Sequence, residues 1–328
     1  MSRDVPPLND PIHGRTAGAP DASGLVEILS ELRAAGYRFA TPTPATIARV
    51  NARPENRAAH DLAGVFGWSR PFAADLLPSG LLRRLADCGL LDKDGDRLRS
   101  RIRVSSLGGD LYAHSAYPTV ASDAVFFGPD TYRFCSALQA RLPIGPEPLG
   151  RAVDIGCGAG PGGLLVARHA PAADVILLDV NETALRFAGA NAEAAGIRNV
   201  ATVRSDLLSG VDGVFDLIVS NPPYLNDPLA RAYRHGGGSL GAQLSIQIVE
   251  RSLERLAAGG RLILYTGVAI VGGVDPFLGA VADRLGASGL SWTYGEVDPD
   301  VFGEELESPP YETVDRIAAV VLTVTRGR

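Results

Sequence analysis

The second half of the chain alternates short apolar runs with longer amphipathic stretches. Apolar runs of strand length lie near 151–155, 175–179, 200–204, 215–220 and 261–266, and helical spacing of apolar residues falls near 161–170, 182–195, 241–258 and 274–287. This alternation predicts a doubly wound α/β fold, in which helices cover both faces of a mainly parallel sheet. Two further runs, 290–296 and 314–325, predict a final strand pair joined by a long loop.

The first half opens with helices and then changes to a hairpin. The predicted helices cover 24–37, a segment that begins at Thr43-Pro44, 58–67 and a segment that begins at Ser79. Asp94-Gly95 follows them and is typical of the turn of a two-stranded ribbon. Helices followed by such a ribbon resemble a winged helix. The predicted parts are a mobile tail (1–20), a smaller, mainly helical winged-helix-like domain (21–105), a bridging segment (106–148) and the α/β domain (149–328).

Arginines alternate along the second strand of this ribbon. The side chains expected on one face are Arg97, Arg99, Arg101 and Arg103, with Leu98, Ile102 and Val104 on the other. In one interpretation this basic row contacts nucleic acid or an acidic partner. In the other it is a solvated strand face, partly neutralised by nearby aspartates. The near-neutral charge of the first half favours the second interpretation.

The composition is that of an ordinary globular protein. Apolar residues make up 46% of the 328 residues and charged residues 21%. Residues 1–10 include no apolar segment of the signal-peptide kind, and no run of about 18 apolar residues occurs along the sequence, so we expect a cytoplasmic location without membrane contact. Residues 151–328 carry 21 acidic against 14 basic side chains. The α/β domain therefore lacks the basic footprint that is usual for nucleic-acid binding.

The three cysteines are scattered along the chain. Cys88, Cys135 and Cys157 lack the spacing of a disulfide framework or of a metal site, and no metal is expected. Cys157 has no histidine or lysine among its near neighbours in sequence to activate it. We therefore interpret it as a small filler rather than as a nucleophile.

A glycine-rich loop follows the first apolar run of the α/β domain. Residues 153–163 read Val-Asp-Ile-Gly-Cys-Gly-Ala-Gly-Pro-Gly-Gly. Gly156, Gly158 and Gly160 thus alternate where the chain must turn sharply from strand to helix. The next strand ends at Asp179, 19 residues after Gly160. An acid at this distance reaches the diol of a ribose.

The same loop also satisfies the G-x-G-x-x-G pattern of dinucleotide-binding proteins. Against that alternative, Asp154 stands just before the glycines. A carboxylate there would repel a pyrophosphate but would attract an ammonium group, directly or through water. S-adenosylmethionine carries such an ammonium group. A plain strand-to-helix turn without a ligand is the third interpretation.

The apolar run 216–220 leads into Asn221-Pro222-Pro223-Tyr224. A loop at the carboxyl end of a buried parallel strand is where open α/β sheets bind their ligands. Its two prolines lack N–H donors, so carbonyl oxygens stay available beside the asparagine amide and the tyrosine ring. These oxygens would hold the hydrogens of a planar NH2 group while the ring covers its face. The nitrogen lone pair would then point at an electrophile.

With both motifs in place, residues 123–325 resemble the small-domain group of class I S-adenosylmethionine-dependent methyltransferases. This group includes release-factor glutamine N-methyltransferases and ribosomal-RNA guanine N2-methyltransferases. The resemblance implies a Rossmann-like, seven-stranded sheet with S-adenosylmethionine as cofactor, and a pre-domain motif at Phe126–Thr131 that caps it. The implied contacts are Asp154, Gly156, Gly158 and Gly160 for the methionine part, Asp179 for the ribose, Ser205, Asp206 and Leu207 for the adenine, and Asn221, Pro222 and Tyr224 for the acceptor nitrogen, with Asn221 also beside the cofactor.

Two polar loops are expected near the acceptor. The first follows the acceptor motif with Arg231, Arg234, His235 and three glycines, and is typical of a substrate lid. In it His235 is either a general base or a hydrogen-bonded loop histidine. The second loop, 296–312, carries six acidic residues between 296 and 307. It is either solvated or favours a cationic protein surface over a phosphate backbone. Its Pro309-Pro310-Tyr311 follows no apolar strand and is not expected to act as a second acceptor motif.

The expected function is N-methylation of a planar amide or amine nitrogen. The leading acceptor is a glutamine side chain of a protein, and the alternative is an exocyclic base amine in RNA or DNA. Further alternatives are a small metabolite, with transfer of a methyl or an aminocarboxypropyl group, and a nucleic-acid-binding regulator that senses S-adenosylmethionine. The intact acceptor motif argues against the sensor. Positioning and desolvation account for catalysis in this scheme, so no metal is required.

Overall fold

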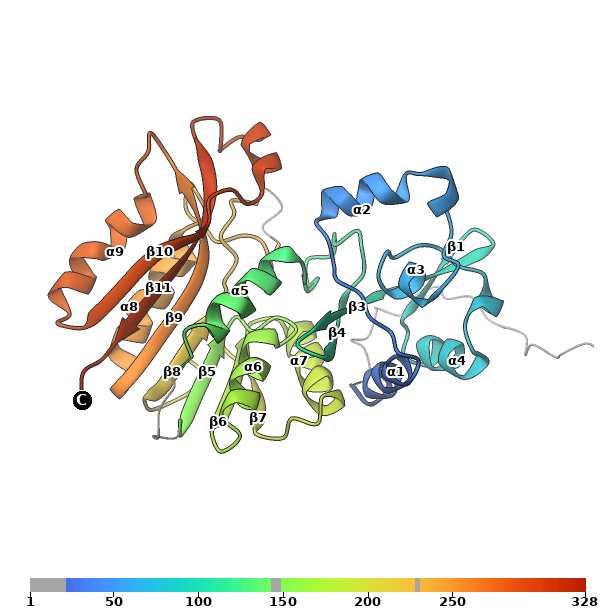
Figure 1. The fold of residues 1–328 in the computed structure, drawn as a ribbon, viewed down its shortest axis with the longest axis horizontal. Helices are drawn as coiled ribbons and strands as arrows, with labels where there is room; N and C mark the ends of the chain where they lie inside the picture. The colour runs from blue at the N-terminus through green and yellow to red at the C-terminus, as the bar shows by residue number, and fades with distance from the viewer. Residues whose placement is uncertain (1–21, 143–148, 228–230) are drawn as a thin grey trace, which may run out of the picture.

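The computed structural model describes residues 22–142, 149–227 and 231–328. A helical N-terminal part lies beside an α/β part with a large twisted sheet (Figure 1). The predicted mobile tail lies outside the described residues. Within those residues, no helix combines the length and the apolar character needed to cross a bilayer. The cytoplasmic location stays a prediction.

A sheet of seven strands forms the centre of the α/β part. In chain order they are β5 (Arg151–Ile155), β6 (Asp174–Asp179), β7 (Val200–Arg204), β8 (Phe215–Ser220), β9 (Leu256–Ile270), β10 (Ser291–Asp298) and β11 (Arg316–Thr325). They lie in the order β10-β11-β9-β8-β5-β6-β7. Strand β11 pairs antiparallel with both of its neighbours, and the other pairs are parallel. The predicted seven-stranded sheet with an antiparallel finish is confirmed.

Helices cover both faces of this sheet. They are α5 (Pro129–Gln139), α6 (Pro161–His169), α7 (Glu182–Ala194), α8 (Gln243–Arg255) and α9 (Pro276–Ala287). Neighbouring residues of β5 belong to different cores. Ala152 lies in the core that includes α5, α6 and α7, whereas Val153 lies in the core with α8 and α9. Because side chains alternate along a strand, a sheet covered on both faces needs apolar residues at successive positions.

Strand β9 is longer than its apolar run predicts. The run covers 261–266, whereas the strand begins at Leu256, and helix α8 ends at Arg255 rather than at 258. Antiparallel β11 pairs with β9 without a break from Arg261 to Ile270. These backbone hydrogen bonds extend the carboxyl end of the strand beyond the apolar run, to Ile270, and at its start Leu256 pairs with Phe215 of β8.

The described N-terminal part contains the predicted helices and ribbon. Its elements are α1 (Ala22–Ala34), α2 (Pro44–Asn51), η1 (Pro54–Asn56), α3 (Leu62–Phe66), η2 (Ala74–Leu76), α4 (Ser79–Asp87), β1 (Leu91–Asp94) and β2 (Arg97–Ser100). Thr43 caps α2 as predicted, since its hydroxyl accepts a 3.2 Å hydrogen bond from the Thr46 N–H. The ribbon turns at Gly95-Asp96, one residue later than predicted. The likeness to a winged helix stays a prediction.

The predicted basic face of Arg97, Arg99, Arg101 and Arg103 is wrong. The chain bends at Arg101, and β3 (Ile102–Leu107) pairs with β4 (Asp110–Ser115) in a separate sheet. Arg103 is therefore turned into the core. It is 2% exposed, and its Nε donates a 3.0 Å hydrogen bond to the Gly67 carbonyl. The two-residue alternation fails because it holds only along an unbroken strand.

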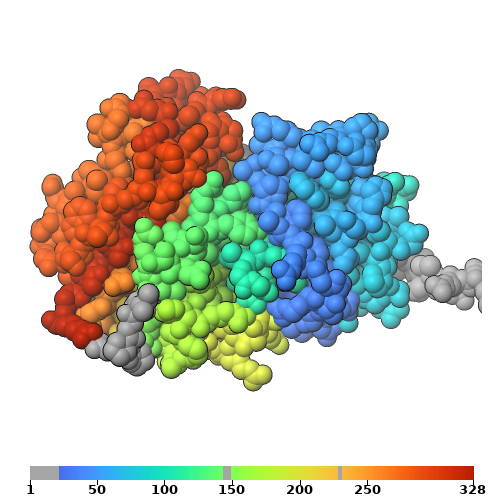
Figure 2. All heavy atoms as spheres, in the orientation of Figure 1, coloured from blue at the N-terminus to red at the C-terminus, as the bar shows by residue number. Residues whose placement is uncertain are grey.

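The two parts of the protein share a continuous apolar core. Helix α1 packs along α7, and buried residues of both parts belong to one cluster. Asn191 of α7 is fully buried at this contact. Its Oδ1 accepts a 2.8 Å hydrogen bond from the Ala113 N–H, and its Nδ2 donates one of 3.1 Å to the Ala113 carbonyl. Figure 2 shows the N-terminal part in close contact with the α/β part. The domain boundaries stay predictions, although the β3–β4 hairpin spans the one expected at residue 105.

Candidate active site

Strand β5 ends in the glycine-rich loop. Gly156 and Gly158 have φ angles of 69° and 55°, which favour glycine. A Cβ at Gly156 would meet no atom within 4 Å, and one at Gly158 would only reach Val125 at 4.0 Å. The loop therefore leaves room for a ligand. Gly160 does not line this space, because a Cβ there would lie 3.2 Å from Ala188.

Asp154 is buried beneath this loop. It is 1% exposed, and its Oδ2 accepts a 2.7 Å hydrogen bond from the Gly163 N–H at the start of α6. A side chain at Gly163 would collide with Leu177, so glycine allows this close approach. Burial raises the pKa of Asp154 to about 7, because desolvation outweighs the hydrogen bond from Gly163. A cation placed beside the carboxylate would favour its ionised form.

Asp179 joins the glycine loop to the end of β6. Its Oδ2 accepts a 3.0 Å hydrogen bond from the Gly158 N–H, and its Oδ1 accepts one of 2.9 Å from the Asn181 N–H. Burial raises the pKa of Asp179, and these backbone hydrogen bonds oppose the rise. Each carboxylate oxygen can accept more than one hydrogen bond. Asp179 can therefore order the loop and bind a ribose diol at the same time.

A third loop follows β7. The Ser205 hydroxyl donates a 2.8 Å hydrogen bond to the Leu207 carbonyl and accepts one of 2.9 Å from the Gly210 N–H. Leu207 has a φ of 51°, an uncommon conformation for a leucine. Asp206, between them, is exposed. The two hydrogen bonds of the Ser205 hydroxyl thus stabilise this strained loop, which lies beside the loops that follow β5 and β6.

The Asn221–Tyr224 segment begins where β8 ends. The Ser220 hydroxyl donates a 2.7 Å hydrogen bond to the Ile155 carbonyl and so ties the ends of β8 and β5 together. None of the hydrogen bonds between described residues involves the Asn221 side chain. Its amide is therefore available to a ligand at the sheet edge.

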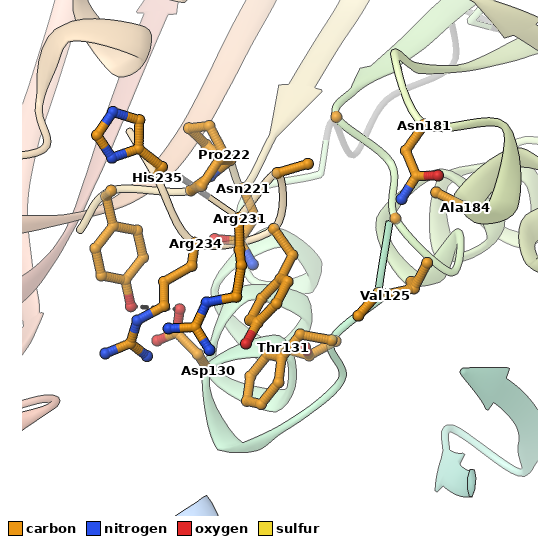
Figure 3. Close-up of a pocket in the computed structure, with 18 of the residues that line it drawn as sticks. Val125, Asp130, Thr131, Asn181, Ala184, Asn221, Pro222, Arg231, Arg234 and His235 are labelled. Atoms are coloured by element: carbon orange, nitrogen blue, oxygen red, sulfur yellow. Dashed lines mark hydrogen bonds between the residues drawn. The ribbon is translucent and has the colours of Figure 1, made fainter. Parts of the chain in front are cut away.

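These loops surround a cavity of about 760 Å³. The predicted site residues that line it are Asp154, Gly156, Gly158, Asp179, Asp206, Leu207, Asn221, Pro222, Tyr224, Arg234 and His235. Asn221 and Pro222 lie across the cavity from Asn181 and Ala184 (Figure 3). The volume lies within the range of roughly 300–1,000 Å³ that is usual for small-molecule sites.

Residues 135–268 match the family model of the methyltransferase small domain. This segment is a methyltransferase small domain. The predicted resemblance to the small-domain group of class I methyltransferases is thereby confirmed, and with it S-adenosylmethionine as the cofactor of the domain. The residues present fit that cofactor: the glycines leave space, Asp154 suits an ammonium group, and Asp179 suits a diol.

Known proteins match a part of the chain. It is 36% identical over 146 residues to the uncharacterized protein YbxB of Bacillus subtilis, covering 44% of this chain and 66% of that one. It is 33% identical over 132 residues to the ribosomal protein uL3 glutamine methyltransferase of Neisseria meningitidis, covering 37% and 44%. It is 31% identical over 117 residues to the ribosomal RNA small subunit methyltransferase C of Shigella flexneri, covering 36% and 31%. The chain thus spans about a third to two thirds of the length of these relatives.

Tyr224 of the methyltransferase small domain is more enclosed than its predicted role suggests. It is 6% exposed, and its ring stands edge-on to Phe302 with 5.8 Å between centroids. Its hydroxyl donates a 2.6 Å hydrogen bond to Asp130, 94 residues earlier in the chain. No local pattern signals this contact. That the ring covers an acceptor stays a prediction.

The two arginines after the acceptor motif are bound within the protein. Arg231 forms a bidentate pair with Asp227, with distances of 2.9 Å (Nε to Oδ2) and 2.5 Å (Nη2 to Oδ1). Arg234 pairs with Glu305 of η3 (Gly303–Glu307). The hydrogen bond from Arg231 is the main cause that lowers the pKa of Asp227 to about 2. The Arg234–Glu305 pair therefore ties residue 234 to η3, and both guanidinium groups already have carboxylate partners.

His235 and Cys157 both line the cavity. The His235 Nδ1 accepts a 3.2 Å hydrogen bond from the Asp227 N–H, as expected of a hydrogen-bonded loop histidine. A general-base role for it stays a prediction. Cys157 is buried, and burial raises the pKa of its thiol well above the usual range. This agrees with a filler rather than a nucleophile.

The acidic loop near the site is only partly solvated. Ion pairs hold three of the six acidic residues between 296 and 307: Glu296 with Arg316 at 2.7 Å, Asp298 with Arg133 at 2.7 Å, and Glu305 with Arg234. Each pair joins the loop to a different segment of the chain. The interpretation as a simply solvated loop is therefore too narrow.

Tyr311 of this loop contacts the acceptor region. It is 1% exposed, and its hydroxyl oxygen accepts a 2.7 Å hydrogen bond from the Asn226 N–H. Pro309-Pro310-Tyr311 therefore supports the loop after the acceptor motif instead of forming a second one. The sequence does not reveal this role of Tyr311, because its partner, the Asn226 N–H, lies 85 residues away.

No pattern in the sequence predicts the residues that form two walls of the cavity. One comes from α2, through Pro44, Ala45 and Ala48, and the other from Phe302 and Glu304. Helix α2 faces the red segment that precedes β11 in Figure 1. Small residues on an amphipathic helix give the same pattern whether they pack on a core or line a cavity. Only the docking of the N-terminal part reveals their place.

Proposed function

We propose that the protein is an S-adenosylmethionine-dependent N-methyltransferase that acts on a planar amide nitrogen, that of a glutamine side chain in a protein. The observation that carries this proposal is the Asn221 amide, which lines the cavity and has no hydrogen-bond partner among the described residues. Asn221 is followed by two prolines, which cannot donate hydrogen bonds. The segment therefore offers oxygen acceptors to an NH2 group.

The bound cofactor supplies a methyl group on a positively charged sulfur. Asp154 and Asp179 hold the ammonium and ribose ends in this proposal. The Asn221 Oδ1 and the Pro222 carbonyl accept the two N–H groups of the acceptor and so orient its lone pair. After transfer the nitrogen loses its extra proton to water, and no base within the protein is needed.

The charges at the cavity favour a protein acceptor. Arg231 and Arg234 line the cavity, but both are paired with carboxylates and are poorly placed to bind a phosphate backbone. Glu304 also lines the cavity and takes part in none of the ion pairs between described residues. A neutral or cationic peptide suits this setting better than a polyanion. The similarity to a glutamine methyltransferase of ribosomal protein uL3 supports the same choice.

An exocyclic base amine of RNA is the second candidate. It presents the same planar NH2 group, and the chain is also similar to a ribosomal RNA methyltransferase. The same oxygens at Asn221 and Pro222 would bind it. Its flanking phosphates would need cations other than the two paired arginines.

Transfer of labelled methyl groups into fractionated cell extract separates the candidates. We expect label from methyl-labelled S-adenosylmethionine in the protein fraction, lost on protease treatment and retained after ribonuclease. Mass spectrometry should then find methylglutamine. Asn221→Ala serves as the control and should transfer little label. Label in RNA would replace the leading acceptor by the second, and no transfer to any fraction would contradict the proposed function.

A further inference from the structure

One carboxylate beside the acceptor motif accepts hydrogen bonds from two tyrosines. Asp130 is the second residue of α5, is 7% exposed and precedes the segment that matches the family model. Its Oδ2 accepts the Tyr224 hydroxyl at 2.6 Å, and its Oδ1 accepts the Tyr265 hydroxyl at 2.5 Å. Asp130 also lines the cavity (Figure 3). Three segments far apart in the sequence meet at this carboxylate.

Without its two hydrogen-bond partners, the ionised carboxylate of Asp130 would be strongly destabilised by burial. Desolvation raises the pKa of Asp130, and the two tyrosine hydrogen bonds oppose the rise. Burial also raises the pKa of Tyr224 and of Tyr265. Both hydroxyls therefore keep their protons near neutral pH and act as donors. The arrangement satisfies both oxygens of Asp130 through neutral groups on two different elements.

The bond to Tyr224 acts directly on the acceptor motif. The Tyr224 ring packs on β9 at Gly267, where any side chain would collide with it, and on Phe302 at another side. This packing sets the plane of the ring, and the hydroxyl bond fixes its far end. Tyr224 and Asn221 are separated only by two prolines, whose backbone is restricted. Anchoring Tyr224 therefore restricts the Asn221 amide as well.

Tyr265 makes the matching bond away from the motif. It lies on β9, and its ring contacts Phe134 of α5 with 6.0 Å between centroids. It does not line the cavity formed by the described residues. The chain thus contains two tyrosines bound to one carboxylate, of which only one belongs to the acceptor motif.

We propose that Asp130 is a positioning residue, which holds the Asn221–Tyr224 segment through the Tyr224 hydroxyl in the geometry that the acceptor requires. This inference rests on the proposed function. It assigns part of the acceptor geometry to a helix that begins before the matched domain. The competing explanation is that the two hydrogen bonds only stabilise the fold, in which case both tyrosines should matter alike.

Three variants of the full chain distinguish these explanations. We expect Tyr224→Phe and Asp130→Asn to slow single-turnover methyl transfer about tenfold, using the extract fraction that the parent methylates. Their affinity for S-adenosylhomocysteine should stay within about twofold of the parent. Tyr265→Phe removes the same kind of bond and should slow transfer by less than about twofold. Equal slowing in the two tyrosine variants would overturn the proposal.

Hydrogen exchange tests the geometry without turnover. The amides of Leu225 and Asn226 should exchange faster in Tyr224→Phe and Asp130→Asn than in the parent, and at the parent rate in Tyr265→Phe. Unchanged exchange in the first two variants would overturn the positioning role even if the parent transfers no methyl group. Absence of transfer by the parent would instead contradict the proposed function alone.

Discussion

The carboxylate of Asp154 accepts a 2.7 Å hydrogen bond from the backbone N–H of Gly163 and is almost completely shielded from solvent. The partial positive charge at the start of α6 stabilises this anion. This stabilisation is smaller than the cost of desolvation, and the pKa of Asp154 therefore rises to about 7. The residue predicted to meet the cofactor ammonium therefore changes charge near neutral pH.

Cofactor affinity should depend on pH through this group. We expect the affinity for S-adenosylhomocysteine to increase as the pH rises to about 7 and then to level off, since the ligand ammonium favours ionised Asp154. Below that pH, binding should release a proton. Calorimetry in buffers with different ionisation enthalpies measures both effects. Asp154→Asn should bind weakly at every pH and release no proton, and a parent with the same affinity on both sides of neutrality would refute this role.

The same carboxylate should affect the stability of the ligand-free protein. Its pKa is about 7 in the folded protein against 3.8 for an ordinary aspartate side chain. Its stabilising contribution is therefore fully present below pH 3.8 and is lost as the pH rises from there through about 7. Thermal melting between these two pKa values should show a decline with pH that is smaller in Asp154→Asn. An identical decline in the variant would assign it to other groups.

Asp179 should contribute strongly to cofactor binding. Asp179→Ala removes a charged acceptor for the ribose and releases the Gly158 and Asn181 amides that it holds. We expect affinity for S-adenosylhomocysteine to fall about ten- to a hundredfold by calorimetry. Asp174→Ala, at the exposed opposite end of the same strand, is the matched control and should bind as the parent does. Preferential binding of NAD by the parent would revive the dinucleotide interpretation.

Asn221 should matter for methyl transfer and little for cofactor binding. Its amide is proposed to orient the acceptor nitrogen as the methyl group moves, so Asn221→Ala should lower kcat about 10²- to 10³-fold. Asn221→Gln keeps the amide but displaces it, and should recover little of the rate. Single-turnover transfer beside calorimetry measures the two effects separately. Full activity in Asn221→Ala would mean that the acceptor is held elsewhere.

The ribbon arginines should give the protein little affinity for nucleic acid. Arg103 is buried, and Arg99 is paired with Asp94 at 2.6 Å. Replacing Arg97, Arg99 and Arg101 together with Gln should change the binding of a fluorescent single-stranded RNA by less than about twofold at physiological salt. Anisotropy over a range of salt concentrations measures this. A steep salt dependence in the parent that flattens in the triple variant would restore the basic-face interpretation.

Local patterns in the chain predict the order of the elements from β5 onwards and the two motif loops, but not helix α5 or the β3–β4 hairpin. The Thr43 cap, the glycines of the β5 loop and the Asn221–Tyr224 segment all lie where their local patterns predict. Each of these signals acts through residues close together in the chain, such as a cap and the N–H three residues later. A local pattern is enough to reveal a feature of that kind.

Which side chains meet depends on the tertiary structure. Tyr224 contacts Asp130 across 94 residues, and Asn226 contacts Tyr311 across 85. A single bend at residue 101 also turned an expected surface arginine, Arg103, into the core. Such contacts depend on how whole elements dock, and the energy of docking is spread over many packed side chains. No period of two or 3.6 residues carries that information.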